Sequence, residues 1–264
     1  MVAAITGAGS GIGRALALEL ASRGVSLALA DIDEDALAET ALLARPFGGR
    51  VKTYRVDVSR EADVTAFAAA TAAEYGRVNL LINNAGVALG GTFAELSQAD
   101  LEWIMGINFW GVVYGCRHFL PLLQRVAPAQ IVNLSSVFGL VAPPGQTGYA
   151  ASKFAVRGFS EALRHELSGS GVRLCVVHPG GINTAIARRA RSGSLAKLSA
   201  DEIARELATF ERRLTTSPHL AAERLLRGVE RGQQRILIGN DARVLDLAQR
   251  LLPERYWALL GRLT

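Results

Sequence analysis

Short apolar runs alternate with longer amphipathic segments from one end of the chain to the other. Most of the apolar runs are continuous rather than alternating with polar residues, which is typical of strands buried on both faces of a parallel sheet. We expect seven strands, at residues 2–6, 25–31, 51–56, 78–83, 130–135, 173–177 and 235–238. Helical spacing between them predicts helices at residues 12–23, 34–43, 60–75, 98–125 and 149–168.

This alternation of strands and helices predicts an α/β fold, because parallel strands need crossover connections, and these are right-handed. The expected architecture is a doubly wound parallel sheet of the Rossmann type, with helices on both faces. A chain of 264 residues is within the size range of one such domain. Since no linker or low-complexity tract interrupts the chain, we expect a single domain over residues 1–264.

A glycine-rich turn follows the first expected strand and opens the first helix. Its spacing from Thr6 to Gly13 is Thr-Gly-x-x-x-Gly-x-Gly, which differs from the common Gly-x-Gly-x-x-Gly fingerprint. Glycines let the backbone approach a pyrophosphate, whose charge is favoured at a helix N-terminus. The segment could be a turn and nothing more, but its place between strand and helix favours phosphate binding. The expected contacts are Gly7, Gly9, Ser10, Gly11, Ile12 and Gly13.

The second expected strand ends at Asp31. An acidic side chain here can accept hydrogen bonds from the adenosine ribose and would repel a 2′-phosphate, which favours NAD over NADP. Ile32 and Ser10 are neutral, and Arg14 is the nearby cation that could weaken this preference, so NADP stays possible. The alternative is that Asp31 caps the helix that begins near residue 33.

Tyr149 and Lys153 are four residues apart in an expected helix, which places both side chains on one face. Free tyrosine titrates at a pKa near ~10, and a nearby positive charge favours the phenolate. We therefore expect the lysine to lower the pKa of the tyrosine. The pattern is typical of a tuned acid or base.

Further motifs follow in a fixed order, and together they resemble the short-chain dehydrogenase/reductases of the single-domain type. The resemblance extends from residue 2 to about residue 238. Besides the glycine turn and the Tyr149/Lys153 pair, the motifs are Asp57-Val58, Asn83-Asn84-Ala85-Gly86, Asn108, Ser136 and Pro179-Gly180. The resemblance implies a hydride transfer between a nicotinamide cofactor and an alcohol or carbonyl group.

The family pattern also implies a catalytic tetrad of Asn108, Ser136, Tyr149 and Lys153. Tyr149 would give or take the proton, and Ser136, preferred over Ser135 by the family spacing, would hold the substrate oxygen. Lys153 would bind the nicotinamide ribose, and Asn108 would anchor a water in a proton relay.

The remaining motifs would hold the cofactor. The resemblance places the adenine at Asp57 and Val58 and the adenosine ribose near Asn84. The nicotinamide end would lie along Pro179, Gly180, Ile182 and Thr184. His178 is expected to be packed at a strand end rather than to act as an acid or base.

Two segments should determine the substrate. Residues 185–214 correspond to the family's substrate lid, polar at first and helical from about residue 199. Apolar residues at 137–143 and 87–89 suggest a hydrophobic secondary alcohol or ketone. The C-terminal extension, residues 240–264, has apolar residues at helical spacing. We expect it to pack over the substrate entrance or on a second subunit; a shallow membrane attachment through Trp257 is the less favoured alternative.

The net charge of +5 and the pI of about 9.6 do not indicate a nucleic-acid partner, because the arginines are scattered. The densest basic stretch, residues 188–191, is expected to be a solvated turn or, less favoured, a contact to an anionic group. Cys116 and Cys175 lie far apart without metal-ligand spacing, so we expect both to be buried and no metal to be bound. No apolar run is long enough to span a membrane and no leader is evident, which predicts a cytoplasmic protein.

The leading hypothesis is thus an NAD-dependent oxidoreductase, assembled through the family's usual helices as a homodimer or homotetramer. A 3-oxoacyl-thioester reductase is an alternative, made less favourable by the long C-terminal extension. A catalytically silent cofactor sensor is another, although a sensor needs neither Tyr149 nor Lys153. An epimerase or dehydratase would require a further acid or base that the sequence does not identify.

Overall fold

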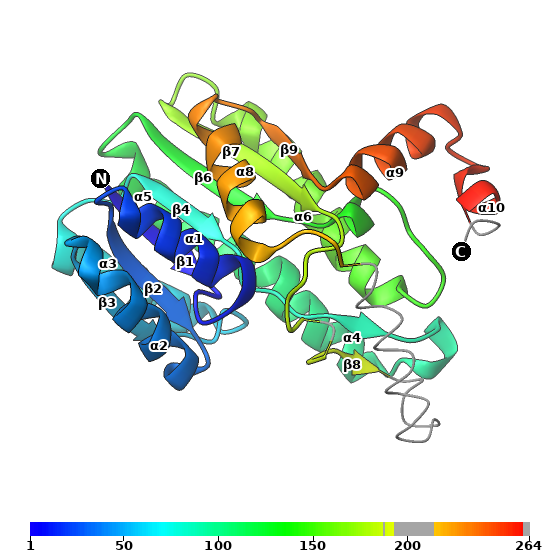
Figure 1. Ribbon diagram of the computed structural model, residues 1–264, viewed down its shortest axis with the longest axis horizontal. Coiled ribbons are helices and arrows are strands. Elements are labelled where there is room, and N and C mark those ends of the chain that lie inside the picture. The colour runs from blue at the N-terminus through cyan, green and yellow to red at the C-terminus, as the bar shows by residue number, and fades with distance from the viewer. Residues whose placement is uncertain (187, 193–213, 261–264) are drawn as a thin grey trace.

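The structure is a computed structural model that describes residues 1–186, 188–192 and 214–260. Its centre is a seven-stranded sheet in the order β3-β2-β1-β4-β6-β7-β9, in which every pair of neighbours is parallel (Figure 1). The strands are β1 Val2–Thr6, β2 Ser26–Asp31, β3 Val51–Arg55, β4 Leu80–Asn83, β6 Ala129–Leu134, β7 Val172–Pro179 and β9 Arg235–Ile238. The predicted doubly wound α/β fold is confirmed, with strand ends that differ by up to two residues.

Helices cover both faces of the sheet. One face packs against α1 Gly11–Ser22, α2 Glu34–Ala44 and α8 Pro218–Glu230, and the other against α3 Glu61–Tyr75, α5 Gly111–Gln124 and α6 Thr147–Glu166. Strand residues contribute to the two cores in alternation, as Ile5 does to the first and Ala4 to the second. Burying a large apolar side chain contributes about 1.5–3 kcal/mol, which explains why the strands read as continuous apolar runs. Figure 1 shows α1 and α8 side by side although they are far apart in the sequence.

The predicted helix at residues 98–125 is interrupted. It consists of α4 Gln98–Met105, a π-helical turn Gly106–Trp110, and α5. A π turn holds one more residue than an α turn and often occurs at functional sites. Here it carries Asn108 into the interior, where the residue is 0% exposed. The spacing of apolar residues did not reveal this local change in winding.

Several elements lie outside the predicted ranges or extend them, and α8 is one of these. A second sheet pairs β5 Leu89–Gly90 with β8 Arg191–Ser192. The helical spacing of the C-terminal extension corresponds to α9 Asn240–Leu251, followed by α10 Tyr256–Leu260. The lid helix expected from about residue 199 lies outside the described residues. Within the described part of the chain, no helix has both the length and the apolar character needed to cross a membrane.

Candidate active site

The candidate site lies at the carboxyl ends of β1 and β4, neighbouring strands from which the chain winds in opposite directions. In open α/β sheets, ligands bind at this topological switch point. The glycine turn follows β1, Asn84 follows β4, and Asp31 ends β2. The sheet order therefore gathers residues that are far apart in the sequence at one edge.

The glycine turn forms a narrow cradle. Gly7 and Gly11 have φ angles of +66° and +53°, a region that side chains other than glycine rarely adopt. A Cβ on Gly13 would lie 2.0 Å from the Gly7 carbonyl oxygen. Ser10 is the N-cap of α1, but its side chain does not cap the helix. The positive end of α1 is thus left for an anion, and the cradle fits a dinucleotide pyrophosphate.

Asn84 fastens this turn to β4. Its Nδ2 donates to the carbonyl oxygens of Thr6 and Gly7, each at 3.0 Å. The Thr6 hydroxyl oxygen in turn accepts from the backbone N–H groups of Asn84 and Ala85, each at 3.1 Å. The Asn84 side chain therefore fixes the backbone of the glycine turn through these hydrogen bonds.

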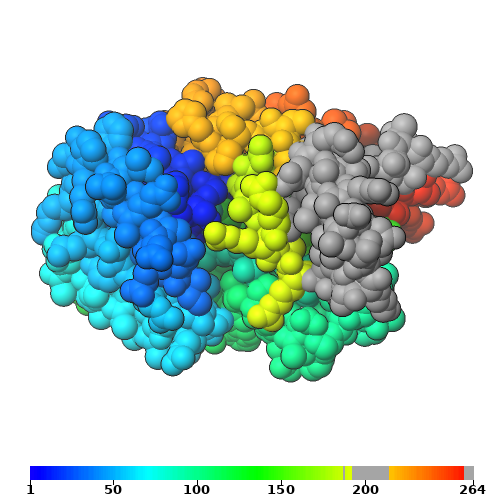
Figure 2. Space-filling view, turned by 60° about the horizontal axis from the view of Figure 1, so that its bottom comes forward, coloured from blue at the N-terminus to red at the C-terminus, as the bar shows by residue number. Residues whose placement is uncertain are grey.

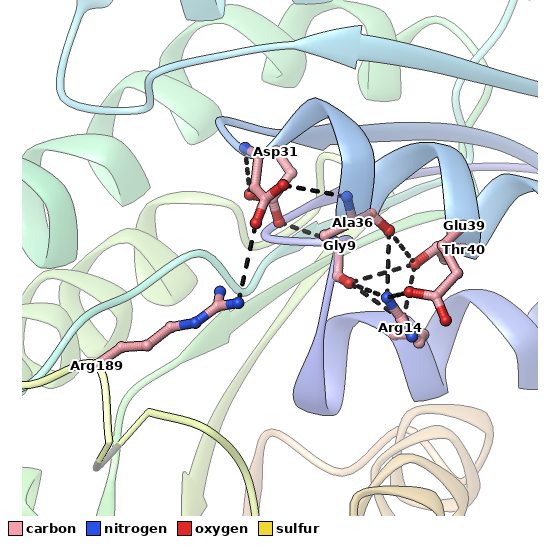
Figure 3. Close-up of polar contacts among 8 residues, drawn as sticks. Gly9, Arg14, Asp31, Ala36, Glu39, Thr40 and Arg189 are labelled. Carbon is pink, nitrogen blue, oxygen red and sulfur yellow. Dashed lines mark hydrogen bonds and ion pairs between the residues drawn. The ribbon is translucent and has the colours of Figure 1, made fainter.

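Asp31 braces the opposite side of the turn. Its carboxylate accepts from the N–H of Gly9 at 2.8 Å (Figure 3). It also accepts from the N–H of Asp33 at 3.1 Å. The residue that caps α2 is Asp33, which accepts from the N–H of Ala36 at 3.1 Å. The alternative that Asp31 is the helix cap is therefore wrong.

The Arg14 guanidinium is engaged within the protein. It donates to Gly9 O at 2.7 Å, to Thr40 Oγ1 at 3.0 Å and to Glu39 Oε2 at 2.7 Å (Figure 3). Another cation comes from the segment after β7, where Arg189 lies 3.9 Å from the Asp33 carboxylate. Arg189 was not among the predicted site residues, because only the fold brings it to the end of β2.

The Asp57-Val58 motif after β3 forms a turn that the Asp57 side chain stabilises. The Asp57 carboxylate accepts from the backbone N–H of Ser59 at 3.0 Å and from its hydroxyl at 2.6 Å. Val58 is buried, and a Cβ on Gly111 would lie 2.9 Å from its side chain. Both residues lie at the end of the strand next to β2, the side of the site opposite to Tyr149.

Lys153 and Asn108 lie in the interior beside the loop that follows β4. Lys153 is 4% exposed, and its Nζ donates to the Leu134 carbonyl oxygen at 3.2 Å. The Asn108 amide bonds to Val87 in both directions, accepting from its N–H at 2.9 Å and donating to its O at 3.0 Å, and it also donates to Ser152 Oγ at 3.0 Å. Asn108 thus ties the β4 loop to α6.

Tyr149 and Lys153 share one face of α6, with the lysine Nζ 5.8 Å from the centre of the tyrosine ring. Burial raises the pKa of Tyr149, and its interaction with the Ser136 hydroxyl acts in the opposite direction. Burial lowers the pKa of Lys153 to about 8. The expected lowering of the tyrosine pKa by the lysine is therefore wrong for the protein alone, because desolvation of the phenolate dominates.

The two adjacent serines have different surroundings. The Ser135 hydroxyl donates to the Lys153 carbonyl oxygen at 2.8 Å, which ties β6 to α6. The Ser136 oxygen accepts from the N–H of Phe138 at 3.1 Å, so its own hydrogen is available to another acceptor. His178 is fully buried with Nδ1 3.0 Å from the Ser136 carbonyl oxygen, and burial lowers its pKa to about 4.

The chain after β7 crosses the site. In Figure 2 this segment, coloured yellow-green, runs beside the blue N-terminal part of the molecule and reaches the green part below it. Thr184 lies over the glycine turn, since a Cβ on Gly11 would be 3.1 Å from its methyl group. Further along, the Arg191 guanidinium stacks on Trp103, with its Cζ 3.9 Å from the centre of the ring, and Arg191 pairs with Leu89 in the small sheet. Residues 188 and 189 form an exposed turn, as predicted, and the exposed Arg189 and Arg191 additionally contact Asp33 and Trp103.

The C-terminal extension packs beside the loop between Ser136 and Tyr149. Ala242, Leu245 and Tyr256 form an apolar cluster with Val137, Phe138 and Val141. The Tyr256 hydroxyl accepts from the N–H of Ala142 at 3.1 Å. Because the Phe138 ring meets the Tyr149 ring edge-on at 6.1 Å, the extension supports the wall next to Tyr149.

Comparisons with known proteins agree with this geometry. Residues 1–194 match the family described as short chain dehydrogenase. The chain is 45% identical over 263 residues to SadH of Mycobacterium tuberculosis, a protein named as an oxidoreductase, covering 98% of this chain and 94% of that one. It is 32% identical over 261 residues to estradiol 17-beta-dehydrogenase 11 of Pongo abelii, covering 98% and 81%. A crystal structure of a short-chain dehydrogenase/reductase from Burkholderia phymatum in complex with NAD has a TM-score of 0.85 and 35% identity, covering 96% and 94%.

Proposed function

Since the chain belongs to the short-chain dehydrogenase family, we propose that it is an NAD-dependent oxidoreductase of hydrophobic secondary alcohols or ketones. The supporting observation is the position of Tyr149, Ser136 and Lys153 beside a glycine cradle that fits a dinucleotide. When bound, the nicotinamide would supply or accept the hydride. The protein would supply position, a proton and the exclusion of water.

In the proposed reduction, Tyr149 donates its hydroxyl proton to the substrate oxygen, and in oxidation it takes that proton back. The Ser136 hydroxyl donates a hydrogen bond to the same oxygen. Lys153, whose pKa is about 8, is largely protonated at neutral pH and faces the tyrosine ring. Its charge would stabilise the phenolate that forms when the proton leaves, and its ammonium would hold the nicotinamide ribose.

We assign Asn108 to positioning. Its amide hydrogen bonds to Val87 and Ser152 fix the distance between the β4 loop and the helix that carries Tyr149. The water relay expected at this residue remains part of the proposal.

The preference for NAD rests on Asp31 and Arg14. The Asp31 carboxylate would repel a 2′-phosphate at the adenosine ribose, and the Arg14 guanidinium is occupied by Gly9, Thr40 and Glu39. The related Burkholderia phymatum structure contains NAD. Arg189 is a cation near this position, through which NADP could still be accepted.

A hydrophobic substrate is favoured by the side chains around Tyr149. Phe138 meets the Tyr149 ring and packs on the buried Val137 and Val141, and the buried Leu89 lies in β5, which follows the β4 loop. The name of the 32% identical Pongo abelii relative refers to estradiol, a hydrophobic secondary alcohol.

The expected dimer or tetramer would use the α5 and α6 surface, where Trp110 and Phe154 are 45% and 38% exposed.

The test is a screen of hydrophobic secondary alcohols and ketones that follows nicotinamide absorbance with NAD(H) and NADP(H) in parallel. The Tyr149→Phe variant is expected to lose turnover while binding NADH as the wild type does. Unchanged turnover in this variant would refute the catalytic role of Tyr149. Turnover by neither cofactor, with NADH still bound, would favour the cofactor-sensing alternative.

A further inference from the structure

Asp241, in the first turn of α9, reaches into the turn that follows β7. Its Oδ2 accepts from the backbone N–H of Gly181 at 2.6 Å. A Cβ on Gly180 would lie 2.1 Å from Oδ2, and a Cβ on Gly239 would lie 2.1 Å from Oδ1. The carboxylate therefore occupies a space that exists only because residues 180 and 239 have no side chain.

The helix that carries Asp241 is anchored separately. Ala242 is 0% exposed and packs in the cluster with Val137 and Val141. Asp246, which is 8% exposed, accepts from Arg235 of β9 at 3.0 Å and pairs with Arg250 at 3.2 Å. Asp241 thus holds the Gly180–Gly181 turn from a fixed support.

The turn determines where the next residues lie. Gly180 continues the pairing of β7 with β9 through its N–H, which donates to Ile238 O at 2.8 Å. Ile182 is 5% exposed and forms an isolated bridge with Thr216, and Thr184 lies over Gly11 of the cradle. A change of direction at Gly181 would therefore be transmitted within three residues to Thr184.

We propose that Asp241 is a positioning residue for the nicotinamide half of the cofactor site, acting through the Gly180–Gly181 turn on residues 182–184. This inference rests on the proposed function, since it requires a nicotinamide cofactor. The carboxylate does not touch the cofactor in this proposal. It fixes the backbone of residues 182–184, which would contact the cofactor. In this way it couples the C-terminal extension to cofactor binding.

The test compares two ligands that share the adenosine and pyrophosphate groups, NADH and ADP-ribose, in calorimetric titrations of the full chain. Asp241→Ala is expected to weaken NADH binding about tenfold, the lower end of the effect of losing one hydrogen bond to a charged acceptor, and to weaken ADP-ribose binding less. Asp241→Asn, whose side-chain oxygen can still accept from Gly181, is expected to restore most of the NADH affinity. A Gly180→Ala variant, whose methyl group displaces the carboxylate, is expected to reproduce the loss.

Tyr256→Phe is the matched control in the same extension, because it removes a contact to Ala142 rather than to the turn. Its NADH affinity is expected to equal that of the wild type. Equal weakening of NADH and ADP-ribose, or no change for NADH in folded Asp241→Ala and Gly180→Ala, would overturn the role of Asp241. A wild-type chain that binds neither ligand would instead overturn the proposed function, and the positioning role with it.

Discussion

The side chains of Asn108 and Lys153 approach the same point of the backbone, at Gly86. A Cβ placed on Gly86 would lie 3.2 Å from Asn108 Oδ1 and 3.2 Å from Lys153 Nζ. One residue comes from the π turn between α4 and α5 and the other from α6. The glycine of the Asn-Asn-Ala-Gly motif thus provides the room in which both buried polar side chains approach the backbone.

Gly86→Ala should therefore lower both activity and stability. The added methyl group must displace Asn108 or Lys153 by a few tenths of an ångström, and overpacking of this kind costs about 1–3 kcal/mol. We expect kcat to fall about tenfold or more, since displacement of positioned groups is costly to catalysis. Gly158→Ala is the control. Gly158 lies on the same helix as Tyr149, and a Cβ added there would meet nothing within 4 Å. A kcat equally low in both variants would contradict this explanation.

Lys153→Met should stabilise the protein while removing activity. Burial lowers the folded-state pKa of Lys153 to about 8 from its ordinary value of 10.5. Between these values the unfolded chain binds more protons, so the contribution of Lys153 to stability rises with pH over this window and is unfavourable below it. At pH 7 the variant should gain roughly 3 kcal/mol in the free energy of unfolding, since each pKa unit corresponds to about 1.4 kcal/mol. Urea unfolding at pH 7 and 10 measures the difference, which should shrink at the higher pH.

The two directions of the reaction should respond oppositely to pH. Alcohol oxidation needs the Tyr149 phenolate, whose formation is opposed by burial, so its kcat/KM should rise with pH. Carbonyl reduction needs protonated Tyr149 and benefits from charged Lys153, so it should fall above about pH 8. Profiles of kcat/KM in both directions test this, and parallel slopes would argue against Tyr149 as the proton carrier.

Much of the fold was predictable from the sequence because a strand buried on both faces must be apolar throughout. Such runs revealed all seven strands of the large sheet. The two-residue strands β5 and β8 are too short to show any period, and their pairing depends on a contact between segments about 100 residues apart. The π turn at Asn108 changes the winding without changing the apolar spacing, so the sequence predicts a continuous helix there.

The candidate site was predictable only where local motifs define it. The glycine turn, Asp31 and the Tyr149/Lys153 pair could be identified from spacing, because backbone geometry relates neighbouring residues directly. Asp241 and Tyr256 carry no such signal, since an aspartate in the first turn of a helix is ordinary and only the sheet order places it beside Gly181. The direction of the Tyr149 pKa shift was also missed, because burial is a property of the fold.

Asp31→Asn should separate the charge of this residue from its role as a brace. The amide oxygen can still accept from Gly9 or Asp33, whereas the charge that would repel a 2′-phosphate is lost. We expect the ratio of kcat/KM for NADP to that for NAD to rise about tenfold or more, since like charges brought together cost several kcal/mol. Asp31→Ala should raise the same ratio but also weaken both cofactors, because the turn loses its acceptor. A wild-type enzyme that already prefers NADP would contradict this assignment.

Tyr256→Phe should affect the substrate and leave the cofactor unaffected. The lost hydroxyl accepts from the N–H of Ala142, in the loop that leads from Ser136 to Tyr149, and Phe138 connects the same cluster to the Tyr149 ring. The KM for a hydrophobic substrate should rise about threefold to tenfold, corresponding to about 1 kcal/mol for one neutral hydrogen bond. Leu247→Ala is the matched control on α9, since Leu247 is 58% exposed on the outer side of the helix and should leave KM unchanged. If both variants raise KM equally, the C-terminal extension acts through its general stability; if neither does, the substrate pocket ends short of the extension.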